Sequence, residues 1–192
     1  FDQDVLERMP GHLAVGHTRY STTGSSRVCN AQPLVLMTRL GPFALAHNGN
    51  LVNAIQLRDQ LQQQGCQATG TTDSELIAFA LQAQVEAGLD WDEAIKAAAR
   101  QCQGAFSLVI GTPDALYGLR DGHGLRPLVF GSLPEADVAS WVLSSETCGL
   151  EAIAFVSTKT WAWSARCLIK TSWSACQAIW LWVIRVIPQR AV

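Results

Sequence analysis

The chain contains 192 residues, of which 48% are hydrophobic and 16% charged, and its formal net charge is −2. A chain of this length can bury a substantial core as one domain. Because it has no dense basic face interleaved with aromatic residues, nucleic acid is not expected as a partner. The apolar run Ala178–Ile184 is too short to span a membrane, so no membrane partner is expected either.

Charge and tryptophan divide the chain into two unlike parts. All 16 acidic residues lie at or before Glu151 with nine of the 14 Lys and Arg residues, which gives this part a charge of −7. The rest carries five basic residues, no acidic residue and five of the seven tryptophans. We therefore predict a domain over residues 1–153 and an atypical Trp-rich tail over residues 154–192. The tail is either translated in a shifted frame, disordered or genuinely divergent.

The six cysteines show neither a CxxC pair nor the spacing of metal ligands. They are expected to be reduced thiols of an intracellular, cytoplasmic protein, most of them small core residues. The chain opens at Phe1 without a methionine or a targeting segment. We therefore expect it to be a fragment or a processed product.

The first predicted element is a strand over His12–Tyr20, followed by a loop rich in hydroxyl groups and glycine at residues 21–26. Arg19, near the end of this strand, has no obvious acidic partner in the sequence. It is either a solvated surface arginine or a guanidinium placed to bind a carboxylate through two parallel hydrogen bonds.

A turn at Asn30–Leu34 precedes a hairpin that starts at residues 35–37 and returns through Phe43–His47. This second run ends in Asn48-Gly49, a pair that usually indicates a β-hairpin turn. The next apolar residues have helical spacing instead, so we predict a strand-to-helix junction at Asn48-Gly49 and a helix over Leu51–Gln64. Exposed together, an amide side chain and a glycine N–H would suit an oxyanion site for acyl transfer. The alternative is a merely structural Asx turn.

Two further helices are predicted. The first has apolar residues at helical spacing over Leu76–Val85, and Thr72 or Asp73 would be its N-cap. Helix capping alone would explain why an aspartate stands at position 73. The alternative is that the Asp73 carboxylate points outward to bind an α-ammonium group. The second begins at Asp90 with a variant capping box and runs to Cys102.

Four strands are predicted in the remainder of the first part. Because strands, helices and then strands follow one another, the sequence favours an α+β fold over βαβ repetition. The four predicted strands are Gly104–Ile110, Ala115–Arg120, Pro127–Leu133 and Trp141–Ser145.

Taken in order, these stretches resemble the class II, N-terminal-nucleophile glutamine amidotransferases and, within that class, the amidophosphoribosyltransferase family. Each stretch is weak evidence alone, but six or more in order over about Gly11–Ile153 are strong evidence. The matching segments are Gly16–Gly24, Asn30–Leu34, Ala46–Asn50, Thr72–Glu75, Gly104–Leu108, Arg120–Leu128 and Ser145–Cys148.

The resemblance implies an αββα sandwich, two antiparallel sheets between helical layers, here incomplete at its N-terminus. It implies that Arg19, helped by Thr22, binds the α-carboxylate of glutamine and that Asp73 binds the α-ammonium group. Asn48 and Gly49 would stabilise the oxyanion of the tetrahedral intermediate.

In the family, an N-terminal cysteine is the nucleophile and its own α-amino group is the base. The released ammonia passes to a phosphoribosyltransferase domain, where Mg²⁺ is present and phosphoribosyl pyrophosphate becomes phosphoribosylamine in the first step of purine synthesis. Complete members are expected to be homo-oligomers. This chain shows neither the cysteine start nor that second domain, so we expect it to hydrolyse no glutamine on its own.

Cys148 resembles the first ligand of the [4Fe–4S] cluster that some family members carry, but the other three ligands would lie beyond this chain. No cofactor is therefore expected here, and a buried thiol is the alternative role of Cys148. Three other hypotheses stay open for the whole chain: a catalytically dead glutamine-binding or regulatory module, the glutaminase domain of another class II amidotransferase, and a non-functional gene fragment.

Overall fold

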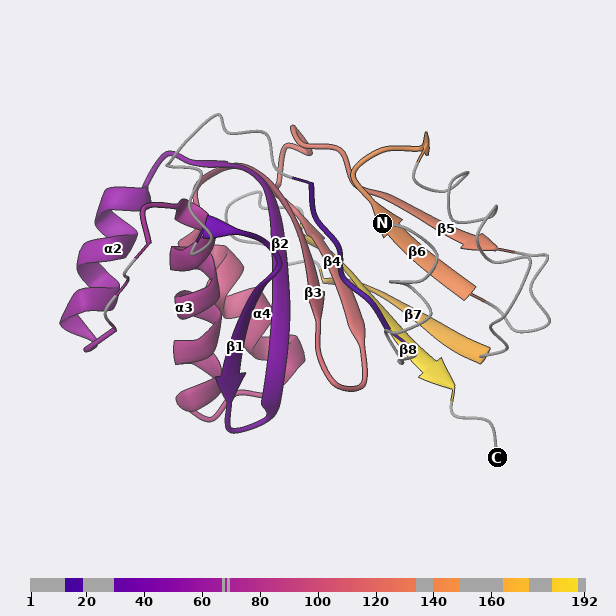
Figure 1. Cartoon of the computed structure of the whole chain (residues 1–192), viewed down its shortest axis with the longest axis horizontal. Coiled ribbons are helices and arrows are strands. Elements are labelled where there is room, and N and C mark those ends of the chain that lie inside the picture. Colours follow the sequence, from indigo (N-terminus) through magenta and orange to yellow (C-terminus); the bar gives the residue numbers. More distant parts are fainter. Residues whose placement is uncertain are drawn as a thin grey trace.

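The structure is a computed structural model that describes residues 13–18, 30–66, 68, 70–133, 140–148, 164–172 and 181–189. Its centre is a six-stranded sheet in the order β1-β2-β3-β4-β8-β7, in which neighbouring strands are antiparallel. A second sheet contains β5 and β6 (Figure 1). The strands are β1 (Leu34–Thr38), β2 (Gly41–Leu51), β3 (Gly104–Gly111), β4 (Leu116–Arg120), β5 (Val129–Leu133), β6 (Ser140–Ser144), β7 (Ser164–Ser172) and β8 (Leu181–Gln189).

The helices α2 (Ala54–Gln63), α3 (Asp73–Glu86) and α4 (Trp91–Gln101) lie on one side of the large sheet, and α2 packs on α3 (Figure 1). Together with the antiparallel sheets they confirm the predicted α+β class. α3 has the most buried residues of the three, whereas α2 buries only two leucines. The side chain of Asp90 accepts a hydrogen bond from the Glu93 N–H at 2.9 Å, which confirms the cap predicted for α4.

The core lies between these helices and alternate residues of the central strands. Successive side chains of a strand point to opposite faces, so one set of β2 and β3 residues meets the helices and the other set does not. The set that faces the helices includes Phe43, Leu45, Phe106, Leu108 and Ile110, all at most 3% exposed.

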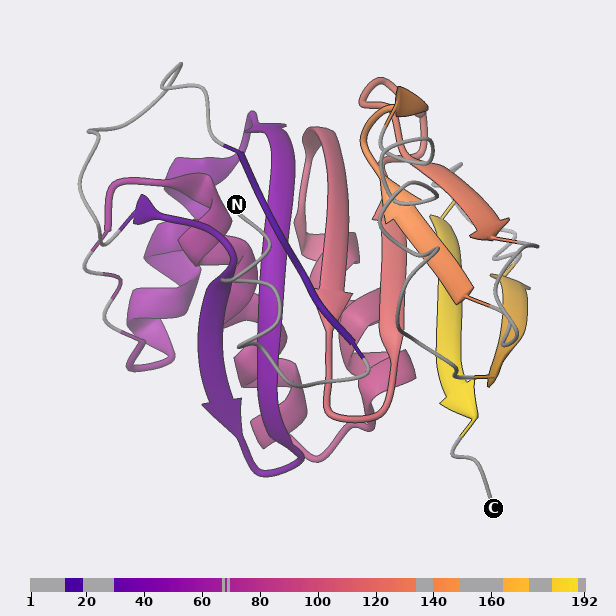
Figure 2. The ribbon, with the colours of Figure 1, turned by 45° about the vertical axis from the view of Figure 1, so that its right-hand side comes forward.

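The opposite face of the sheet is contacted by two other segments. Residues 13–18 run across it (Figure 2), with Leu13 and Val15 against Gly111 of β3. Leu143 of β6 packs on Gly118 of β4. Residues 13–18 form no strand, so the strand predicted over His12–Tyr20 is wrong for its described part. The residue pattern alternates in this segment because every second side chain turns toward the sheet, and not because the segment pairs with a neighbouring strand.

The tail contains regular structure that the sequence did not predict. β7 and β8 pair with each other, and β8 pairs with β4 over Leu116–Gly118. The absence of a clear hydrophobic period therefore did not prevent strand formation there. Within the parts of the chain that the structure describes, no helix has the length and apolar character that a membrane span requires.

Candidate active site

The site is built around the end of β2, where backbone hydrogen bonds alternate between the two neighbouring strands. The Val52 N–H donates to the Gln103 carbonyl at 2.8 Å. On the β4 side, the Phe106 carbonyl accepts from the Asp121 N–H at 2.9 Å, and the Phe106 N–H donates to the Asp121 carboxylate oxygen Oδ2 at 3.2 Å. In an antiparallel sheet, successive residues of a strand direct their backbone N–H and carbonyl groups to opposite neighbouring strands, so these bonds fix the direction for each residue of β2. Asn48 therefore bonds toward β3, and Gly49, opposite Phe106, directs its N–H and carbonyl toward the β1 side.

β1 does not extend far enough to use these groups. Its last pair is Leu34 with Leu45, and beyond this pair the N–H groups of β2 donate to side chains instead of to the backbone of β1. The His47 N–H donates to Gln32 Oε1 at 2.6 Å, and the Leu51 N–H donates to Asp73 Oδ2 at 2.9 Å. The Gly49 N–H lies between these two donors, and none of the residues that the structure describes accepts a hydrogen bond from it.

The strand-to-helix junction predicted at Asn48-Gly49 is wrong. β2 continues through this pair to Leu51, and α2 begins only at Ala54. The strand continues because its backbone passes very close to β3: a Cβ on Gly49 would lie 2.7 Å from the Phe106 Cα and would also collide with the Ala105 carbonyl oxygen. Gly49 also has a φ of 149°, which disfavours any side chain there.

Asp73 is the first residue of α3, and Thr72 occupies the N-cap position without a capping hydrogen bond from its side chain. Capping therefore does not explain Asp73. Its carboxylate reaches the edge of β2 instead, bonding the Leu51 N–H with one oxygen and lying 3.6 Å from His47 Nδ1 with the other. The Asp73 side chain keeps 16% of its surface exposed, so a ligand can reach it.

Gly49 and Asp73 thus face the same edge of the sheet. The Gly49 N–H is two residues from the Leu51 N–H, which is about 7 Å along a strand. An anion-stabilising donor and a carboxylate at this separation suit a molecule with a cationic group near one end and a carbonyl near the other. The edge can therefore stabilise negative charge that develops on that carbonyl oxygen.

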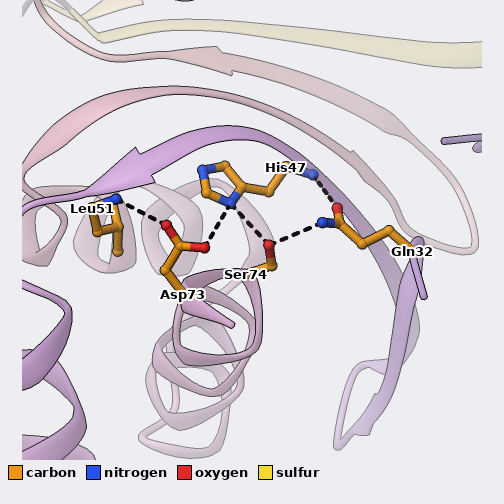
Figure 3. Close-up of polar contacts among 5 residues, drawn as sticks. All are labelled: Gln32, His47, Leu51, Asp73 and Ser74. Atoms are coloured by element: carbon orange, nitrogen blue, oxygen red, sulfur yellow. Dashed lines mark hydrogen bonds and ion pairs between the residues drawn. The ribbon is translucent and has the colours of Figure 1, made fainter. Parts of the chain in front are cut away.

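A buried polar network holds Asp73 in place (Figure 3). His47 Nδ1 lies 3.0 Å from Ser74 Oγ, and Gln32 Nε2 donates to the same oxygen at 3.0 Å. Burial lowers the pKa of His47 to about 4, and the positive charges of His17 and Arg126 add to this effect against the opposing influence of Asp73. The imidazole is therefore neutral at physiological pH and leaves the negative charge of Asp73 uncompensated.

His47, Ser74 and Gln32 were not among the site residues predicted from the sequence. One signal was available: in the alternation of β2, His47 is a polar residue on the same face as the apolar residues Phe43 and Leu45. What it could not reveal is the partner, because Ser74 and Gln32 are 27 and 15 residues away in the sequence.

Comparison with known proteins identifies the family. The pattern of the glutamine amidotransferase domain matches residues 17–152, which is more than half of the chain. The chain belongs to the glutamine amidotransferase domain family. The amidophosphoribosyltransferase of Synechococcus elongatus is 61% identical over 153 residues, and the mouse enzyme is 39% identical over 169 residues. These matches cover 80% of this chain but 31% and 33% of those relatives, so the chain spans about a third of their length.

Solved structures support the same assignment. The glutamine phosphoribosylpyrophosphate amidotransferase of Bacillus subtilis, complexed with ADP and GMP, matches with a TM-score of 0.62 and 34% identity. It covers 71% of this chain and 28% of the other. A structure titled as the allosteric regulatory enzyme of purine biosynthesis matches with a TM-score of 0.63 and 36% identity, over the same shares of both chains.

The other predicted site residues of this glutamine amidotransferase domain are placed as follows. Asn48 is half-buried on the face opposite His47, because neighbouring residues of a strand alternate. Arg19 and Thr22 lie outside the described residues. Cys102 is buried beneath the site, and burial, with a further contribution from Asp73, raises the pKa of its thiol to about 12, so it remains a protonated core residue.

Proposed function

We propose that this chain is the glutaminase part of an amidophosphoribosyltransferase, which takes ammonia from glutamine for transfer to phosphoribosyl pyrophosphate. The observation that carries this proposal is the Gly49 N–H and the Asp73 carboxylate on one edge of the sheet. The family match and the relatives support it. The transfer to phosphoribosyl pyrophosphate would take place on the part of the protein that this chain does not span. Homo-oligomer assembly would likewise be a property of the complete protein.

Asp73 would bind the α-ammonium group of glutamine. Among the described residues, neither lysine nor arginine pairs with this carboxylate, and its neighbour His47 is neutral. A partly buried carboxylate without a cationic partner attracts an ammonium group more strongly than a solvated one, because less water screens the pair. The α-carboxylate would be bound by Arg19 with the help of Thr22, as the resemblance implies.

The Gly49 N–H would stabilise the oxyanion. In the class II reaction, the cysteine sulfur adds to the side-chain amide carbon of glutamine and the carbonyl oxygen becomes negatively charged. Collapse of this intermediate releases ammonia and leaves a thioester. A donor that needs no reorganisation is most effective at that oxygen, and the Gly49 N–H is already outside the ladder. Asn48 would supply the second donor, as the resemblance implies.

A metal ion or cluster does not fit the residues described. No three His, Cys, Asp or Glu side chains are grouped among them as a metal ion would require. Cys148 is exposed, so the buried thiol predicted as its alternative role is wrong, and its Sγ lies 3.4 Å from a carboxylate oxygen of Glu146.

Titration calorimetry of the chain with L-glutamine tests the proposal. Asp73→Asn should weaken binding about tenfold or more, because a hydrogen bond between charged groups is lost. Asp59→Asn is the matched control: the same change at an exposed position of α2 should leave the affinity unchanged.

A ligand control makes the test specific for the ammonium group. 4-Carbamoylbutanoate is glutamine without its α-amino group, so it should bind the unchanged chain weakly and should lose nothing further in Asp73→Asn. Equal affinity of L-glutamine for the unchanged chain and for Asp73→Asn would refute the assignment of Asp73.

A further inference from the structure

The Gln32 side chain continues the β1–β2 ladder at the point where the backbone of β1 has left it. Leu34 pairs with Leu45, so the same register continued by two residues would place Gln32 opposite His47. The acceptor there is the Gln32 side chain, whose Oε1 receives the His47 N–H at 2.6 Å. The hydrogen bonds that continue the β1–β2 ladder therefore end at His47, two residues before Gly49.

The chemistry of the contacts fixes the orientation of this amide. A backbone N–H can only donate, so the atom that faces His47 must be the amide oxygen. The Gln32 NH₂ then points to Ser74 Oγ, which must accept from it at 3.0 Å. With that lone pair occupied, the hydroxyl of Ser74 has a restricted orientation toward His47 Nδ1, also at 3.0 Å.

Ser74 directly follows Asp73 in the first turn of α3, and it is 3% exposed. One side-chain amide therefore connects the β2 backbone at His47 with the turn that carries the Asp73 carboxylate (Figure 3). Buried hydrogen bonds of this kind restrict the arrangement of the groups that they join, here Gln32, Ser74 and the Nδ1 side of His47; His47 Nε2 is buried and has no partner among the described residues.

We propose that Gln32 is a positioning residue of the glutamine site: its amide joins β2 to the first turn of α3 and so keeps the Asp73 carboxylate aligned with the open Gly49 N–H. This inference rests on the proposed function for its effect on glutamine. The arrangement of Ser74 and His47 that it predicts can be measured without any ligand.

Gln82 provides a matched control. It lies on α3 and also joins this helix to the sheet through a side-chain amide, but to β1, since its Nε2 donates to the Met37 carbonyl at 2.7 Å. This contact lies in an exposed part of the edge and away from His47. A residue that merely tethers β1 to α3 would behave like Gln82.

The experiment compares Gln32→Met and Gln82→Met in the full 192-residue chain by L-glutamine calorimetry and by the ring ¹⁵N signals of labelled histidine, of which the chain has four. Gln32→Met should weaken glutamine binding about tenfold, as expected for a lost buried hydrogen-bond network. It should also shift the His47 ring signals toward a mixture of tautomers. Gln82→Met should change neither quantity.

Gln32→Glu keeps an acceptor for the His47 N–H but loses the donor to Ser74, and it is the second variant if Gln32→Met does not fold. It should shift the same ring signals. Unchanged ring signals in the folded variants, or an equal effect of Gln82→Met, would overturn the inference. If the unchanged chain binds no glutamine, the proposed function fails, and the ring signals alone decide the role of Gln32.

Discussion

Acidification should destabilise the protein through His47. The imidazole is 4% exposed, and burial lowers its pKa from 6.5 to about 4. In the unfolded chain the same group would titrate near its ordinary value. The folded protein therefore binds fewer protons than the unfolded chain at every pH between these two values.

The sign and size of the effect follow from this difference. A histidine whose pKa is lowered by folding contributes its full stability above pH 6.5 and loses it as the pH falls toward 4. A difference of 2.5 pKa units, the gap between 6.5 and about 4, corresponds to about 3 kcal/mol at most. The pKa of Asp121 is also lowered, by four backbone hydrogen bonds that outweigh its burial, so its contribution to stability is lost at lower pH than that of His47.

Urea unfolding at several pH values between 6.5 and 4.5 measures this loss. His47→Asn should remove most of the pH dependence in that window, although it also lowers stability at neutral pH. The matched control is His123→Asn, the same substitution at an exposed position of a bend, which should preserve the pH dependence. The reasoning would be refuted by equal stability at both ends of the window, or by an unchanged slope in His47→Asn.

Two other substitutions test the surroundings of the site. Asn53→Ala should lower the free energy of unfolding by about 2 kcal/mol in urea titrations. The reason is that the Asn53 amide donates to the Gln101 carbonyl at 2.8 Å and accepts from the Gln103 N–H at 2.9 Å. A loss below about 0.5 kcal/mol would contradict this. Gly49→Ala should cost about 3 kcal/mol or more, since its Cβ would collide with β3 at a φ that alanine disfavours. A normal melting temperature for Gly49→Ala would show that β2 and β3 are not in such close contact.

The sequence predicted the central elements of the fold well because their patterns are local. The hairpin of β1 and β2, the helices α3 and α4 and the strands up to β6 all carry clear hydrophobic periods and turn residues. The boundary at Asn48-Gly49 was misjudged because Leu51 fits both a strand and a helix. The close approach of β3, a contact between segments distant in the sequence, favours the strand conformation through Leu51.

The site could be predicted in its residue types but not in its connections. Asp73 and Gly49 were singled out from their motifs, yet the sequence could not show that the Asp73 carboxylate bonds the Leu51 N–H instead of capping α3. It also could not show that a side-chain amide replaces the ladder of β1 at Gln32. These features depend on the register of β1, which the sequence does not specify.

The amide signal of Gly49 in a ¹H–¹⁵N spectrum gives the most direct test of the central claim, that its N–H is left open beside Asp73. We expect this amide to exchange with solvent faster than that of Asn48. We also expect L-glutamine to shift its signal, and Asp73→Asn to need a higher L-glutamine concentration for the same shift. Slow exchange of the Gly49 amide, together with a signal that L-glutamine does not move, would show that this N–H is already bonded and takes no part in binding.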